Sequence, residues 1–101
     1  MANAVSPTSL GHPIATYQLA FNASGGADVY ATFDTFQQAM IRTSSNCYID
    51  FDTPADPTRS MLMNSSDTQV QAFDFHGCNV KTIHAVGATG SGTLYIMVIQ
   101  N

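Results

Sequence analysis

The sequence predicts an all-β protein, namely a single antiparallel β-sandwich or jelly roll of about eight short strands with an extended N-terminal arm. Three observations predict this class. Apolar and polar residues alternate with a period of two in short segments. Gly, Pro and Asn mark turns between those segments. A chain of 101 residues with 45% apolar residues has room and material for one domain.

The expected strands follow one another from residue 14 onward, and turn signals lie between most of them. They cover 16–21, 28–33, 37–44, 46–52, a short apolar stretch at 60–64, 68–75, 80–86 and 93–99. The clearest alternation is in 46–52, where Cys47, Ile49 and Phe51 share one face. One alternative stays open. Phe33, Phe36 and Met40 also fit a helical stripe, which would allow a helical turn in residues 34–40.

The first thirteen residues differ from the rest of the chain. Residues 1–13 carry no Asp, Glu, Lys or Arg and contain two prolines, so we expect an extended arm followed by a sandwich domain at 14–101. Val5 and Leu10 are isolated apolar residues that would dock on a neighbouring surface. Such an arm buries too little surface to fold alone, and we expect a partner to hold it.

The last expected strand is apolar on both faces. Its two alternating sets are Leu94, Ile96 and Val98 on one face, and Tyr95, Met97 and Ile99 on the other. A strand of an antiparallel sandwich normally keeps one face in water. We therefore expect another subunit or the arm to cover the second face, and we take Tyr95, Met97 and Ile99 as interface residues.

Composition argues against several kinds of partner. Only Arg42, Arg59 and Lys81 are basic, and the net charge is −4, which disfavours binding to nucleic acid or to an anionic membrane surface. No apolar run approaches the length of a membrane span, and the N-terminus does not have the pattern of a signal peptide. Two cysteines in such a chain are expected to be reduced and buried.

A metal site is the first chemical candidate, because His76, Cys78 and His84 lie within nine residues. However, a strand that leaves the turn would carry His84 about 15–20 Å from His76, and the spacing matches no zinc pattern. A fourth ligand would have to come from Cys47 or Asp74. We therefore expect no metal here, but a buried Cys78 beside a turn and two partly exposed histidines.

Other chemical sites are also weakly supported. Asp50 and Asp52, on one strand face, and Asp56 in the next loop are candidate calcium ligands, but the glycine and glutamate of an EF-hand loop are missing. The nucleophile motif G-x-S-x-G is absent, and "GATGSG" does not precede a helix. We expect no catalytic residue, no cofactor and no enzymatic activity.

The order of segments between residues 37 and 100 resembles small virion proteins of tailed bacteriophages. The resemblance is carried by a strand "AMIRT", the aromatic-acidic strand "CYIDFD", a Pro-containing loop, a short apolar stretch, and the final hairpin "VKTIHAVGATGSGTLYIMV". It implies a compact β-sandwich without enzymatic activity, similar to capsid decoration (cement) proteins. Related sandwiches also occur in tail and fibre parts.

This resemblance implies a structural protein of the virion, assembled in the host cytoplasm, that stabilises the capsid by subunit packing, and the apolar last strand and the uncharged arm agree with it. Its partners would be the major capsid protein or other virion subunits, and it would form a homo-oligomer, with a trimer among the options. A tail or fibre component is the alternative within this class. A glycan-binding sandwich is the alternative from another class, with Tyr30 and Tyr48 as the aromatic side chains available to stack on sugar rings.

Overall fold

The structure is a computed structural model, and it describes residues 14–23, 27–66 and 70–100. These residues form seven strands and no helix, so the predicted all-β class is confirmed. The strands are β1 (Ile14–Phe21), β2 (Val29–Thr43), β3 (Cys47–Phe51), β4 (Met61–Met63), β5 (Gln71–Asp74), β6 (Val80–Gly87) and β7 (Gly92–Gln100). The predicted arm 1–13 lies outside the described residues.

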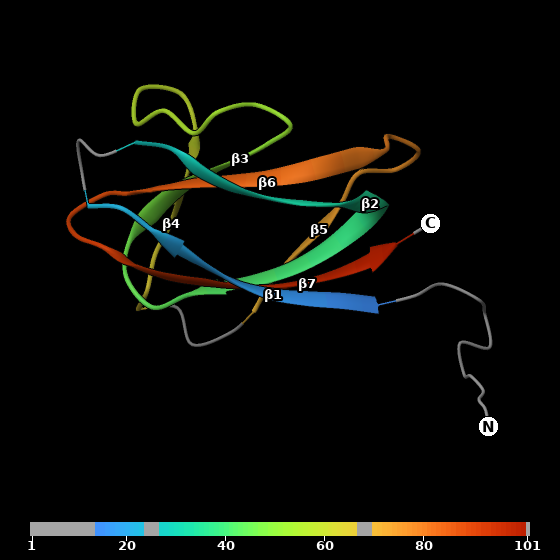
Figure 1. Cartoon of the computed structure of the whole chain (residues 1–101), viewed down its shortest axis with the longest axis horizontal. Helices are drawn as coiled ribbons and strands as arrows, with labels where there is room; N and C mark the ends of the chain where they lie inside the picture. The colour runs from blue at the N-terminus through green and yellow to red at the C-terminus, as the bar shows by residue number, and fades with distance from the viewer. Residues whose placement is uncertain (1–13, 24–26, 67–69, 101) are drawn as a thin grey trace.

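All neighbouring strands are antiparallel and belong to one hydrogen-bonded sheet. Along the sheet the order is β1-β7-β2-β6-β3-β4, and β5 pairs with β2 beside this path. The first half of β2 pairs with β6, while its second half lies between β7 and β5. Figure 1 shows the result, with β6 and the start of β2 on one side of the molecule and β1 and β7 on the other. The sandwich or jelly roll description stays a prediction, because the strands form one continuous sheet.

Strand β2 explains why about eight strands were expected and seven are observed. The predicted strands 28–33 and 37–44 are two halves of this single strand of 15 residues. The register shifts between Thr32 and Phe36 and again between Phe36 and Gln38, so the apolar periodicity is interrupted there. This interruption produced the helical alternative for residues 34–40, which is wrong. Irregularities of this kind bend a strand and increase its twist.

The core is built from the inward side chains of the strands on both sides of this bend. Phe36, Ile41, Ile83, Leu94 and Val98 are completely buried. The predicted alternation is confirmed in β3 and β7, where Cys47 and Ile49 and the set beginning with Leu94 point inward. Full burial of such an aliphatic side chain stabilises the fold by about 1.5–3 kcal/mol.

Candidate interaction surface

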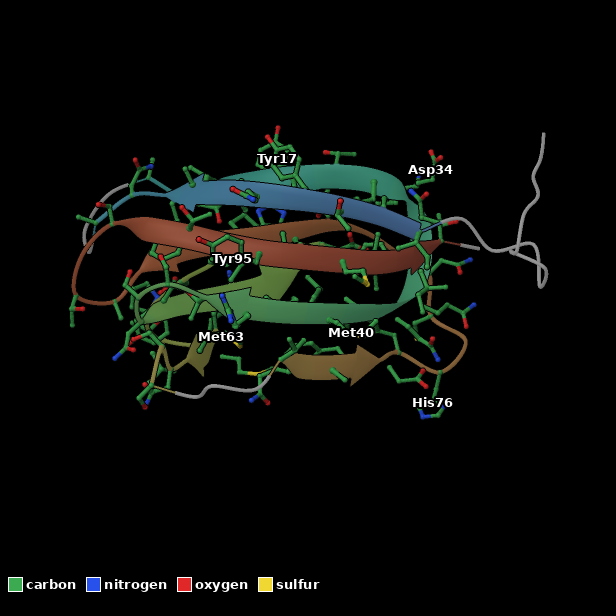
Figure 2. All side chains as sticks on the ribbon, turned by 90° about the horizontal axis from the view of Figure 1, so that it is seen from below. Tyr17, Asp34, Met40, Met63, His76 and Tyr95 are labelled. Atoms are coloured by element: carbon green, nitrogen blue, oxygen red, sulfur yellow. The ribbon has the colours of Figure 1, made fainter. Side chains whose placement is uncertain are left out.

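The side of the sheet that faces away from the core, over β1, β7, the second half of β2 and β5, is called the outer face below. Cross-strand pairing arranges its residues in three rows. The rows are Gln18–Tyr95–Arg42, then Thr16–Met97–Met40–Ala72, and then Ile14–Ile99–Gln38–Asp74. Val70, just before β5, lines a groove of this face together with Arg42 and Tyr95 of the first row. Figure 2 looks at this face, with Tyr95 on β7 and Met40 on β2.

Several apolar side chains of the outer face are open to solvent. Tyr95 is 37% exposed, Met97 38%, Val70 53% and Ile14 63%. A shallow groove of about 630 Å³ runs beside Tyr95, Met97 and Val70, and residues of β1, β2 and β7 form the rest of its lining. Large apolar side chains that lie together on a surface usually mark a site where another molecule binds. None of the described segments covers this face.

Polar contacts fix both ends of the face. The guanidinium carbon of Arg42 lies 5.5 Å from the centre of the Tyr95 ring, a cation–π contact. At the other end the amide of Gln38 donates to Asp74, with 3.4 Å between nitrogen and oxygen. The backbone N–H of His76 donates to the same carboxylate and holds the pKa of Asp74 below its ordinary value. Asp74 is therefore an anion at neutral pH.

The structure brings three of the five predicted interface residues together. Tyr95, Met97 and Ile99 lie side by side on β7, with Ile99 partly buried. Val5 and Leu10 lie outside the described residues. Sequence reasoning missed Met40 and Arg42, the β2 neighbours of Met97 and Tyr95. Only the pairing of β2 with β7 places these two residues in one surface with β7.

The three candidate zinc ligands lie in different environments. His76 and Cys78 are exposed in the turn before β6, whereas His84 is buried on β6 with 8% exposure. The expectation of a buried Cys78 and a partly exposed His84 is therefore wrong; the buried thiol is Cys47, and this burial raises its pKa. Within the described residues, no three His, Cys, Asp or Glu side chains are grouped as metal ligands.

His84 belongs to a network that holds the segment after β3 against β6. Its Nδ1 lies 2.9 Å from Asp28 Oδ2, and its Nε2 lies 3.0 Å from Thr82 Oγ1. Asp28 also accepts the N–H of Ala55, and Thr82 Oγ1 lies 3.1 Å from Asp52 Oδ1. Carboxylate, imidazole and hydroxyl occur in this order in nucleophilic catalysis. Here the Thr82 hydroxyl also donates to Asp52, so the hydrogen bonds continue from Asp28 through His84 and Thr82 to Asp52.

The three candidate calcium ligands are occupied by protein donors. Asp50 accepts bonds from Arg59 and Ser60, and Asp56 accepts two from Thr58. Asp52 follows β3 with a φ of 58°, so the expectation that it shares a strand face with Asp50 is wrong. Each carboxylate already has partners that organise the loop after β3.

The two tyrosines considered for glycan binding lie on the opposite side of the molecule from the outer face. Tyr30 is 59% exposed, and its ring centre lies 5.1 Å from that of His84. Tyr48, on β3, is only partly exposed and pairs with Val86, one row away from Tyr30. The two tyrosines therefore lie in neighbouring rows of the same face, on either side of β6.

Comparisons with known proteins assign no family to this chain. No family model, no curated protein and no solved structure matches it. Among the described residues, no helix is long and apolar enough to cross a membrane.

Proposed function

We propose that this chain is a non-enzymatic structural protein of a tailed-bacteriophage virion, and specifically a capsid decoration protein that stabilises the shell by subunit packing. The observation that supports this proposal is the outer face, where apolar side chains from neighbouring strands lie together and partly exposed. The charged residues make up only 10% of the chain. A surface of this kind favours association through burial of apolar area rather than through charge.

The presence of many copies on one shell would strengthen binding through such an interface. A single small apolar contact binds weakly, but many copies on a symmetric shell act together when each binding event brings the next one close. The protein would then add contacts between shell subunits and raise the pressure that the shell withstands. No covalent step is needed for this role.

The test is a charge placed in the centre of the outer face. Met97→Asp puts a carboxylate among apolar neighbours, so we expect binding to particles that lack this protein to weaken by about tenfold or more. The fold should persist, because Met97 points away from the core. Cosedimentation with the particles measures binding, and circular dichroism and thermal unfolding measure the fold.

The matched control is Met61→Asp, the same change at a methionine of β4 that is 50% exposed and lies outside the outer face. It should bind particles as the unmodified protein does. Equal binding by both variants and the unmodified protein would contradict the proposal, as would binding to tails alone.

A further inference from the structure

The outer face carries one charge of each sign, at opposite ends. Arg42 lies in the first row and Asp74 in the third, and the other residues of the three rows are uncharged. Asp74 pairs with Gln38, which precedes Arg42 by four residues on β2. At about 3.3 Å per residue, the two charges are separated by about 13 Å along the strands. The middle row, with Met97, Met40 and Ala72, lies between them.

This distribution of charge is self-complementary, because the positive end of one copy can face the negative end of another. When two copies meet face to face about a two-fold axis across the strands, the first row of each copy lies over the third row of the other. Arg42 then lies over Gln38 of the second copy, one strand away from the Asp74 carboxylate to which that Gln38 donates, and this happens twice because the contact is symmetric. A two-fold axis along the strands would instead bring the two copies of Arg42 to the same level. Charge therefore selects the first arrangement.

We propose that the outer face binds a second copy of this chain in that first arrangement. The apolar residues agree with it, since Met97 lies over Met97 of the second copy and Tyr95 lies over Ile99. Two packed sheets keep their strands within about 30° of each other, which this geometry allows. The inference rests on the proposed function insofar as both use the outer face. The partner that it adds is a second copy of the same chain.

The test is a pair of charge reversals and their combination, measured by sedimentation velocity of the full chain at about physiological ionic strength. Arg42→Asp and Asp74→Arg each bring like charges close together on neighbouring strands of the two copies, so each should raise the dimer dissociation constant by about tenfold or more. The double variant Arg42→Asp/Asp74→Arg restores opposite charges and should dimerise within about threefold of the unmodified protein.

Lys81→Asp is the control for net charge, because it changes the charge as Arg42→Asp does but at an exposed position of β6 outside the outer face. It should leave dimerisation unchanged. Thermal unfolding of each variant separates loss of association from loss of the fold. A double variant that dimerises no better than either single variant would overturn the proposed arrangement.

A protein that stays monomeric at concentrations of hundreds of micromolar would also overturn it. Particle binding distinguishes this failure from failure of the proposed function. A monomer whose binding to particles is abolished by Met97→Asp would show that the shell takes the outer face directly. A dimer that binds no particle would leave the inference standing and contradict the function.

Discussion

Asp52 joins the end of β3 to the neighbouring strand β6 through one carboxylate oxygen. Its Oδ1 accepts the N–H groups of Lys81 and Thr82, at 2.9 and 2.8 Å, and lies 3.1 Å from the Thr82 hydroxyl. Burial alone would raise the pKa of Asp52. These hydrogen bonds, helped by nearby His84, outweigh burial and lower the pKa below its ordinary value. The charged form of Asp52 is therefore the one that the fold stabilises.

A group whose pKa is lowered by folding contributes stability above its unfolded pKa, about 3.9 for Asp, and loses that contribution as the pH falls through its folded pKa. Asp52→Asn keeps an oxygen acceptor and tolerates the positive φ, but it removes the charge. We expect this variant to have a lower free energy of unfolding than the unmodified protein above about pH 5. The difference should shrink in acid.

Urea unfolding at a series of pH values measures this difference. Asp56 and Asp74 also have lowered pKa values and titrate in both proteins, so comparing the two removes their contribution. A difference that stays constant down to about pH 2 would show that Asp52 acts by shape and not by charge.

The role of Asp52 was not visible in the sequence. The alternation of Cys47, Ile49 and Phe51 was read correctly, but it also placed Asp52 in the strand. The end of a strand can depend on hydrogen bonds to residues far away in the sequence, such as those of Asp52 to Lys81 and Thr82. Here the partner is β6, thirty residues later, and no local pattern contains that information.

At the scale of elements, the strand positions were mostly predictable and their connections were not. Period-two alternation identified the strands because one face of each packs on the core. The union of two predicted segments in β2 was missed, since the register shifts around Phe36 move an apolar side chain out of the simple alternation. The buried position of Phe36 follows from the bend, and the bend follows from the pairing of β2 with both β6 and β7.

Gly87 offers a test at this scale, because it connects the end of β6 to the end of β1. Its N–H donates to the carbonyl of Asn22 at 2.8 Å. A Cβ at this position would overlap the backbone oxygens of Asn22 and Gly90, which cannot move away as a side chain tip could. We expect Gly87→Ala to lower the free energy of unfolding by about 1–3 kcal/mol.

Gly90→Ala is the matched control three residues later, since a Cβ there would meet no atom within 4 Å. We expect a change of at most about 0.5 kcal/mol for it. Denaturant unfolding of both variants makes the comparison. Equal stability of the two would mean that the β6–β7 connection adjusts freely, contrary to the packing around Gly87.

At the scale of the whole molecule, the outer face could be predicted only in part. The sequence identified its β7 residues, because a strand with two apolar faces is unusual in a sheet with one wet side. It did not identify Arg42 or Met40, since their place beside Tyr95 and Met97 depends on a pairing across more than fifty residues. The two opposite charges, Arg42 and Asp74, likewise come to lie at the two ends of one face only when the chain folds.

The proposed function requires that the outer face becomes buried when the protein binds particles, and methionine oxidation measures this burial directly. Free protein at low concentration and protein bound to particles are treated briefly with peroxide, and the oxidation of each methionine is read by peptide mass spectrometry. Met97 is the test residue. Met61, 50% exposed on β4 and outside the outer face, is the internal control. We predict that Met97 oxidises in the free protein and is protected on particles, while Met61 oxidises equally in both. Equal oxidation of Met97 in the two states would contradict burial of the outer face on particles.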